Sequence, residues 1–177
     1  GGTGFTATPF ASWPALAAKL GCGEIWVKDE TPNVGGAHKA RHLMGVMLYL
    51  LVDARRRGAD GAAGRPGLAI SSCGNAALAA ATIARSTGWP LDVFVPSSAS
   101  DAIRERLTQL AATVHVCART PGGHGDPCQA SFRSAVAQGA VPFCCQGSDN
   151  GLTIDGGKTL AWEMVADSDN PPGPRAT

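Results

Sequence analysis

The chain has 177 residues, of which 44% are hydrophobic and 16% charged, so it is long enough to form a domain with a buried core. Its formal net charge of +1 excludes nucleic acid as the main partner, because phosphate binding needs a basic surface. No apolar run reaches the ~20 residues that span a bilayer and no signal peptide is evident, so we expect no membrane partner and a cytoplasmic location.

Strand-like and helical segments alternate along the chain. We expect strands at 24–28, 67–71, 91–95, 113–116 and 141–145, and helices at 39–57, 75–87, 101–111, 128–138 and 157–166. The segments 119–127 and 167–177 are rich in Gly, Pro or polar residues, and we expect a loop in the first and loop or disorder in the second. Strands separated by helices indicate an α/β fold, with a three-layer parallel sheet that has helices on both faces.

Six cysteines are scattered along the chain, and no two of them have Cys-x-x-Cys spacing. Cys73 lies in a Gly-Asn loop, and Cys144 and Cys145 are adjacent at the end of a strand-like run. This placement disfavours both a zinc site and a disulfide framework. We therefore expect reduced, mostly buried thiols and no metal site.

Two loops have unusual compositions. Lys39 follows His38 and the pair Gly35-Gly36, and it opens the helix 39–57. Two glycines just ahead of a lysine let the backbone approach a flat ligand, because glycine has no Cβ. The second loop follows the next strand and opens the next helix, with the sequence Ser71-Ser72-Cys73-Gly74-Asn75. Ligands of parallel sheets bind at the carboxyl ends of the strands, where both loops are expected.

Two further segments complete a pattern. One is Asp155-Gly156-Gly157-Lys158-Thr159-Leu160-Ala161-Trp162-Glu163, and the other combines Thr8-Pro9-Phe10 with Ile25-Trp26-Val27-Lys28-Asp29-Glu30. In this order, the four motifs resemble the β-family (fold type II, tryptophan synthase β-like) of pyridoxal-phosphate-dependent enzymes. The nearest branches are threonine synthase, serine/threonine dehydratase and diaminopropionate ammonia-lyase.

The resemblance implies a cofactor, pyridoxal 5′-phosphate, and a set of site residues. In relatives the residue at the position of Lys39 forms the internal Schiff base and then acts as general base. Asn75 and His38 would contact the cofactor. The substrate would be bound by Ser71, Ser72, Cys73, Gly74, Asn75 and Gln146, with backbone N–H groups at the helix start meeting its carboxylate. The family usually has Ser or Thr where Cys73 stands.

Simpler interpretations exist for several residues. His38 can be a turn residue, Asn75 a helix cap, and Gln146 and Asn150 ordinary polar loop residues. We expect a structural salt bridge from Arg41. In the same way, Lys158 and Thr159 are expected to be architectural, and Gly122 to Gly125 to be a surface loop rather than a phosphate cradle.

The resemblance also predicts how the chain is divided. Residues 1–40 would belong to the larger domain, 41–145 would form a smaller α/β domain with the substrate loop, and 146–177 would begin the larger domain again. Relatives bind the cofactor phosphate with a glycine-rich loop that follows the segment matching 156–166. We therefore expect an N-terminal half with an incomplete second domain, which by itself binds the cofactor weakly.

The function implied is that of a pyridoxal-phosphate-dependent lyase acting on a small amino acid. Its reaction would be β- or γ-elimination or replacement through Lys39, in a full-length protein expected to be a homodimer. The alternative is a non-catalytic remnant of the fold that serves as a binding or interaction module.

Overall fold

The computed structural model describes residues 4–58, 64–119, 122 and 124–169. The first half of the described chain contains β1 (Phe10–Ser12), α1 (Pro14–Leu20), β2 (Trp26–Lys28), the 3-10 helix η1 (Val34–Gly36), α2 (Lys39–Arg56), β3 (Leu68–Ser71) and α3 (Asn75–Thr87). The second half contains β4 (Leu91–Pro96), α4 (Asp101–Gln109), β5 (Thr113–Cys117), α5 (Pro127–Ala137), β6 (Val141–Pro142) and α6 (Leu152–Asp169).

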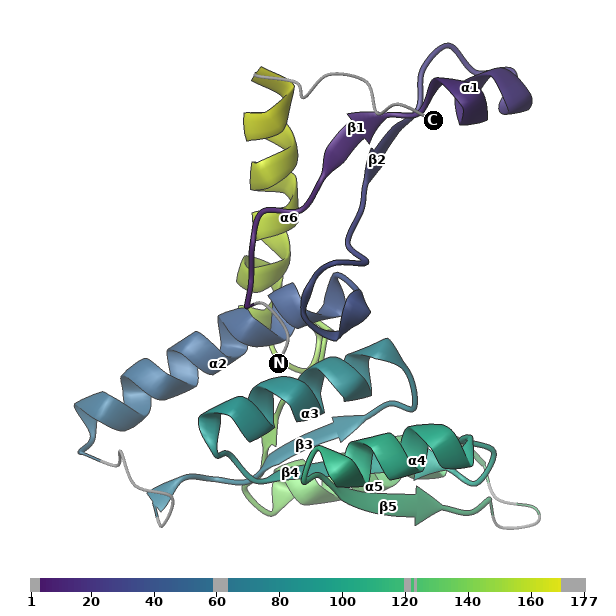
Figure 1. The fold of residues 1–177 in the computed structure, drawn as a ribbon. Helices are drawn as coiled ribbons and strands as arrows, with labels where there is room; N and C mark the ends of the chain where they lie inside the picture. Colours follow the sequence, from purple (N-terminus) through teal and green to yellow (C-terminus); the bar gives the residue numbers. More distant parts are fainter. Residues whose placement is uncertain (1–3, 59–63, 120–121, 123, 170–177) are drawn as a thin grey trace.

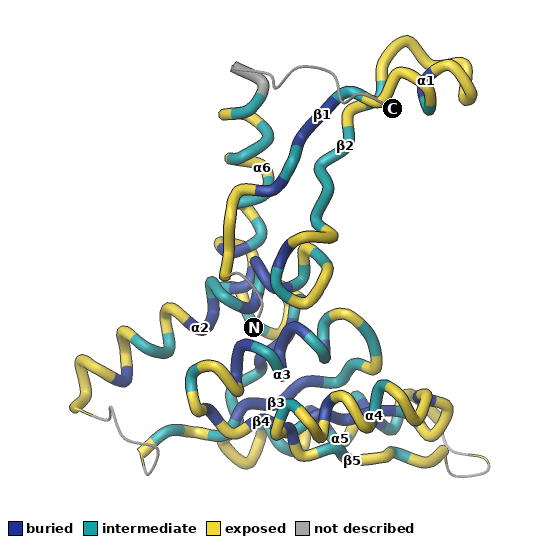
Figure 2. Tube along the Cα trace, viewed as in Figure 1, coloured by how far each residue is buried: buried dark blue, intermediate teal, exposed yellow. Residues whose placement is uncertain are grey.

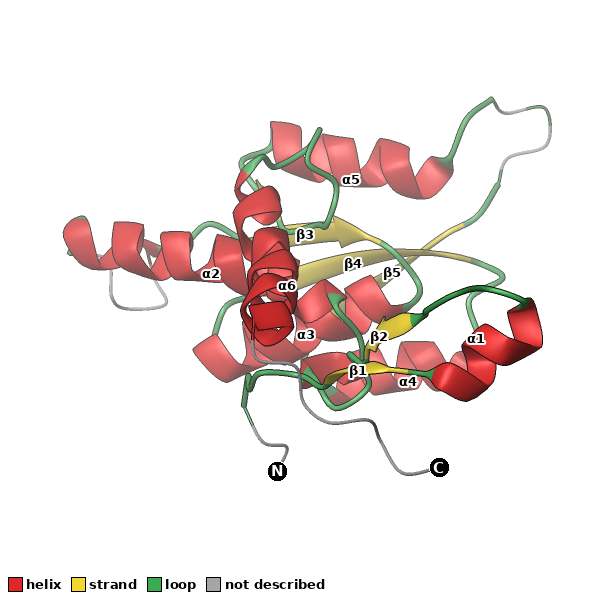
Figure 3. Cartoon of the chain, turned by 90° about the horizontal axis from the view of Figure 1, so that it is seen from above, coloured by secondary structure: helices red, strands yellow, loops and turns green. Residues whose placement is uncertain are grey.

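A parallel sheet with the strand order β5-β4-β3-β6 lies at the centre of the fold. Helix α5 covers one face of this sheet, and α3 and α4 cover the other, as Figure 3 shows. Parallel neighbours need a crossover between strands, and each crossover here contains a helix. The predicted α/β fold with three layers is therefore confirmed.

The core lies between this sheet and its helices (Figure 2). Strands β3 and β4 have buried side chains on both faces, as expected for strands in the middle of a parallel sheet. The helix that packs against them, α3, buries mainly alanines, at positions 77, 79, 80, 81 and 84. These small side chains allow the helix to approach the sheet closely, and Gly88 then ends it in the left-handed conformation.

A second group of elements rises from one side of the sheet (Figure 1). Strands β1 and β2 pair antiparallel, with Phe10 opposite Lys28 and Ser12 opposite Trp26, and they lie beside α6 and carry α1. Helix α2 packs against both α3 and α6, and so joins the two groups. Among the helices of the described chain, none is long and apolar enough to cross a membrane.

Element boundaries differ from the sequence prediction at the C-terminal side. The expected strand 141–145 is only Val141–Pro142, because the chain turns away after Phe143 donates its N–H to Ala69. Helix α6 begins at Leu152 instead of 157, since the side chain of Asn150 accepts the Leu152 N–H at 3.1 Å. Helix α6 continues to Asp169, so the prediction of loop or disorder at 167–177 is wrong for residues 167–169. Residues 170–177 lie outside the described part of the chain.

The N-terminal elements were incompletely predicted. The strand expected at 24–28 is Trp26–Lys28, and both β1 and α1 were missed. Strand β1 has three residues and α1 has seven, which is too short for a hydrophobic period to emerge. The helix expected at 101–111 ends at Gln109, and Ala111 takes a positive φ of 62° in the turn that follows.

Helices α2 and α6 cross at glycines. A Cβ added to Gly45 would lie 2.7 Å from Gly156 Cα, and one added to Gly156 would overlap the carbonyl oxygen of Arg41. One added to Gly157 would overlap the ring of His42. Two glycines inside α6 weaken helix propensity, and close contact with α2 is their structural reason.

Replacing Gly156 by alanine is expected to destabilise the protein. Alanine gains about 1 kcal/mol in helix propensity, but its methyl group must push two helix backbones apart, which costs about 3 kcal/mol. We expect a net loss of about 2 kcal/mol in the free energy of unfolding, measured by urea denaturation. Gly151→Ala is the matched control, because a Cβ there meets nothing within 4 Å, and equal loss in both variants would contradict the packing argument.

Candidate active site

Residues 29–38, the loop between β2 and Lys39 that we call the lysine loop, are shaped by local hydrogen bonds. Asn33 accepts the N–H of Val34 at 2.7 Å and donates to Glu30 at 2.8 Å, which starts the 3-10 turn. Gly35 and Gly36 then take positive φ values of 74° and 69°, a conformation that other residues rarely adopt. The chain enters α2 directly afterwards, with His38 as N-cap and Lys39 as first residue.

Lys39 is partly buried, and its amine is not engaged by the protein. No hydrogen bond or ion pair joins Nζ to any residue that the structure describes. Its backbone is held in place, because the thiol of Cys145 lies 3.8 Å from the Lys39 carbonyl oxygen. The lysine therefore has a fixed backbone and an amine available to a ligand.

The lysine loop and the loop 71–75 are brought together by packing. A Cβ on Gly35 would lie 3.4 Å from the Cα of Ala79, so η1 sits directly against α3. Figure 1 shows α2 and α3 beginning on the same side of the molecule, the side to which β3 points. The prediction that both loops follow strands of the parallel sheet is correct for the loop 71–75, which follows β3. It is wrong for the lysine loop, because β2 pairs with β1 in a separate antiparallel sheet, and packing of η1 against α3 places this loop instead.

The loop 71–75 presents backbone groups at the start of α3. Ser72 donates its N–H to Phe94 at 3.2 Å, which holds the loop to the neighbouring strand β4. Gly74 is the N-cap of α3 and Asn75 its first residue, and no side chain caps the helix. Asn75 is exposed and its amide has no partner among the described residues, so its interpretation as a helix cap is wrong.

A cavity of about 520 Å³ opens beside the same loop. It lies beyond the ends of β3, β4 and β5, and Ser71, Ser72 and Cys73 form part of its wall. Neither Lys39 nor Asn75 lines it. The cavity thus lies on the side of the loop that faces the N-terminus of α5.

The remaining predicted residues lie around the lysine. The His38 ring contacts His42 edge-on, with centroids 5.8 Å apart. Although this side chain is exposed, partial desolvation lowers the pKa of His38, and the charges of Lys39 and His42 lower it further. Gln146 is exposed on the loop before α6, whereas Asn150 donates to the Pro142 carbonyl and so has a structural role.

A buried ion network lies next to the lysine loop. Arg41 donates to Glu30 at 2.8 Å and to Glu163 at 2.6 Å, and Lys28 lies 2.9 Å from Glu163. The predicted salt bridge of Arg41 is therefore confirmed, and it ties β2 and α2 to α6. Thr159 accepts from Arg41 at 3.3 Å, as its expected architectural role requires.

Other predictions have mixed outcomes. Lys158 is exposed and pairs with Asp155 at 2.9 Å. All six cysteines are free thiols, but only Cys128 and Cys144 are buried, so the expectation of mostly buried thiols is wrong. The segment Gly122 to Gly125 lies partly outside the described residues. In the described part of the chain, no three His, Cys, Asp or Glu side chains are grouped to hold a metal ion.

The ion network makes stability depend on pH. Burial alone would raise the pKa of Glu163, but hydrogen bonds from Arg41, Lys28 and Thr8 outweigh it and lower the pKa from 4.5 to about 2. A carboxyl group whose pKa is lowered by folding stabilises the fold at pH values above its pKa in the unfolded chain. This stability is lost as the pH falls from 4.5 toward 2. At about 1.4 kcal/mol per pKa unit, the contribution of Glu163 is about 3 kcal/mol.

Glu163→Gln is expected to flatten the acid limb of the stability curve. Urea denaturation between pH 5 and pH 2 should show a steeper loss for the unmodified protein than for the variant, because only the carboxyl titrates. Part of the pH dependence should remain in the variant because of Glu30. Burial raises the pKa of Glu30, but hydrogen bonds, the strongest from Arg41, outweigh it and lower this pKa too. Identical slopes in the two proteins would contradict the assignment.

Comparisons with known proteins agree with these features. Residues 3–175 match the family model described as pyridoxal-phosphate dependent enzyme. Cysteine synthase 1 of Neurospora crassa is 33% identical over 110 residues, which cover 61% of this chain and 27% of that protein. Its length is therefore matched over about a quarter only.

Solved structures match nearly all of the chain. Apo diaminopropionate ammonia lyase of Escherichia coli matches with a TM-score of 0.73 at 21% identity, covering 95% of this chain and 49% of that chain. Maize serine racemase matches with a TM-score of 0.71 at 21% identity, and the match covers 93% of this chain and 45% of the racemase chain. A fungal L-serine ammonia-lyase from Rhizomucor miehei matches with a TM-score of 0.65 at 21% identity, and the match covers 94% of this chain and 48% of the lyase chain.

The chain spans about half the length of these structures, and at such identities they show its fold. The family model covers 173 residues of the 177 and includes both loops and the α6 segment. The chain belongs to the pyridoxal-phosphate dependent enzyme family.

Proposed function

We propose that this chain carries the lysine and the substrate loop of a lyase that acts on a small amino acid by elimination or replacement at Cβ or Cγ. The observation that carries the proposal is the Lys39 amine, which has a fixed backbone and is without a partner among the described residues. Its loop packs through Gly35 against α3, the helix that the loop 71–75 opens. Cofactor attachment and substrate binding would thus meet at one edge of the sheet.

The residues present fit the family's cofactor. Lys39 would hold it through Nζ, and the unpartnered amide of Asn75 would donate to an oxygen on its ring. Gly35 and Gly36, which have positive φ values, carry no Cβ that would obstruct a flat ring. His38, whose lowered pKa favours the neutral imidazole, would lie beside Lys39 without adding a charge.

The chemistry would be divided between the cofactor and this chain. When bound, the cofactor withdraws electrons from Cα and acidifies the α-hydrogen. The Nζ of Lys39 would take up that proton as general base. N–H groups from Cys73 to Asn75, at the start of α3, would bind the substrate carboxylate, because a helix N-terminus favours an anion, whereas the Ser72 N–H is already donated to Phe94. Gln146 remains a proposed substrate contact.

The choice of a lyase rests on the sequence motifs. Matched structures include ammonia lyases, racemases and a synthase, so they support amino-acid chemistry in general. Screening small amino acids for release of ammonia or a 2-oxo acid tests the elimination directly. Racemisation without release of either product would contradict it, and the absence of any cofactor on Lys39 would favour the alternative of a non-catalytic binding module.

The proposed domain division has support from packing. The sheet strands and α3, α4 and α5 fall within 41–145, and the Arg41 network links residues before 41 to α6 in 146–177. The division into 1–40, 41–145 and 146–177 stays a proposal on that basis. Homodimer formation and a cytoplasmic location stay predictions from the sequence.

Asn75→Ala is expected to reduce turnover by about 10–100-fold, the effect of one misplaced site group. Because the Asn75 side chain caps no helix, thermal stability should change little. Steady-state kinetics and a melting curve measure the two effects, with Gln109→Ala on the exposed face of α4 as control. Normal kinetics in the Asn75 variant would remove this residue from the site.

A further inference from the structure

Two thiols that the proposed function does not use meet where β5 joins α5. Cys117 is the last residue of β5, and Cys128 lies in the first turn of α5. The two side chains interact, since Cys117 contributes to the raised pKa of Cys128. In addition, the Cys117 sulfur lies 3.7 Å from the hydroxyl of Ser131, one turn further along α5. Cys117 is thus packed against the helix face that carries Cys128.

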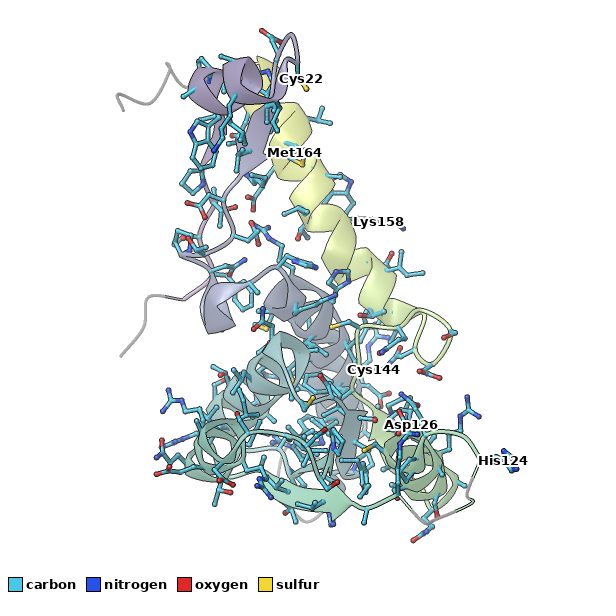
Figure 4. The ribbon with its side chains drawn as sticks, turned by 90° about the vertical axis from the view of Figure 1, so that its right-hand side faces the viewer. Cys22, His124, Asp126, Cys144, Lys158 and Met164 are labelled. Atoms are coloured by element: carbon cyan, nitrogen blue, oxygen red, sulfur yellow. The ribbon has the colours of Figure 1, made fainter. Side chains whose placement is uncertain are left out.

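Both thiols line the cavity of about 520 Å³ beside the substrate loop. Cys117 is partly exposed in it, whereas Cys128 is 3% exposed. The backbone at Cys128 is fixed, because its N–H donates to the side chain of Asp126 at 2.8 Å, at the start of α5 (Figure 4). A small reagent that enters the cavity therefore meets the more exposed Cys117 first, and the buried Cys128 second.

We propose that Cys117 and Cys128 form a site of reversible oxidation, at which a low-molecular-weight disulfide such as oxidised glutathione converts the two thiols into one disulfide bond. The proposal is independent of the reaction at Lys39. It rests on the packing of Cys117 against the helix face that carries Cys128, on the cavity that the two thiols share and on their unequal exposure.

The exchange proceeds in two steps. The thiolate of Cys117 attacks one sulfur of oxidised glutathione, the bond between the two glutathione sulfurs breaks, and one glutathione leaves with the electron pair and takes up a proton. Cys128 then attacks the Cys117 sulfur, forms the protein disulfide and releases the second glutathione. The protein loses two electrons and two protons, and the reagent becomes two thiols.

The order of attack follows from the surroundings of each thiol. Burial, with smaller contributions from Cys117 and Asp126, raises the pKa of Cys128 to about 12, so Cys128 is a poor first nucleophile. Cys128 is well placed for the second step because Cys117 packs against the same face of α5 and both thiols line the same cavity. The new bond would tie the end of β5 to the start of α5 and narrow the cavity beside Cys73.

Peptide mapping after mild oxidation tests the proposal. The protein is treated with oxidised glutathione, its remaining thiols are alkylated, and it is digested with trypsin. Cleavage at Arg106, Arg119 and Arg133 places the two thiols in separate peptides, 107–119 and 120–133. We expect these peptides to be joined by a bond that dithiothreitol breaks, and to carry most of the oxidised cysteine.

Single variants separate the two steps. In Cys128→Ser, Cys117 should retain one glutathione as a mixed disulfide, and in Cys117→Ser the peptide 120–133 should stay unmodified. Cys22→Ser is the control, because Cys22 lies at the opposite end of the molecule (Figure 4) and its loss should leave the joined peptides unchanged. Melting curves check folding, and the unmodified protein decides the question where a variant fails to fold.

Two results would overturn the proposal. One is a stable glutathione adduct on Cys117 in the unmodified protein without joined peptides. The other is a main product that joins Cys73 to either thiol, which would show that a different pair reacts. Both results leave the reaction at Lys39 unaffected, so they are distinguishable from failure of the proposed function.

Discussion

Replacing Lys39 by alanine is expected to abolish turnover and to prevent attachment of the cofactor, while the fold is preserved. A general base typically contributes 10²–10⁴-fold and this lysine would also anchor the cofactor, so we expect a loss of about 10³-fold or more. The Nζ has no partner among the described residues, so its removal leaves no buried group unpaired. Alanine also suits the first turn of α2.

Turnover, cofactor absorbance and a melting curve measure these effects together. Lys158→Ala is the matched control, because Lys158 is exposed on α6 (Figure 4) and pairs there with Asp155. We expect normal kinetics in that variant. Retained turnover in Lys39→Ala would end the assignment of Lys39 as the reactive lysine.

Arg41→Ala is expected to have the largest effect on stability. The substitution leaves Glu30 and Glu163 partly buried and negatively charged without their common partner. Removing one member of a buried ion pair costs about 3–5 kcal/mol. Since the network joins β2, α2 and α6, we expect a lower midpoint of urea denaturation and weaker positioning of the lysine loop.

An exposed ion pair supplies the comparison. Arg57 pairs with Asp53 on the surface of α2, where the two side chains are 73% and 51% exposed. Exposed pairs contribute about 0–1 kcal/mol, so Arg57→Ala should change the midpoint little. If Arg41→Ala lost no more stability than Arg57→Ala, the network would not hold these elements together.

Much of the fold could be predicted from the sequence because its signals are local. Alternation of apolar strands with helices of regular period predicted the parallel sheet, and Gly88 marked the end of α3. The pair Gly35-Gly36 indicated the lysine loop, and the pair Gly74-Asn75 indicated the loop 71–75. The prediction was weaker for α6, since Gly156 and Gly157 appeared to be a helix boundary and their contact with α2 depends on tertiary packing.

Other features depend on residues far apart in the chain. Arg41 and Glu163 are 122 positions apart, and their pairing needs α6 to return beside α2. Asn75 is a residue type that often caps helices, but Gly74 is the N-cap of α3. The side-chain amide of Asn75 therefore has no partner among the described residues. The packing of Cys117 against the helix that carries Cys128 likewise arises only when α5 folds back on β5.

Reductive trapping of the cofactor tests the central claim most directly. The full-length protein is incubated with pyridoxal phosphate, reduced with borohydride and mapped by mass spectrometry. The chain has four lysines, of which Lys28 is held by Glu163 and Asp167, and the exposed Lys19 measures nonspecific labelling. Our account predicts a phosphopyridoxyl group on Lys39 well above the level on Lys19 or Lys158. Equal labelling of Lys39 and Lys19, or selective labelling elsewhere, would contradict it.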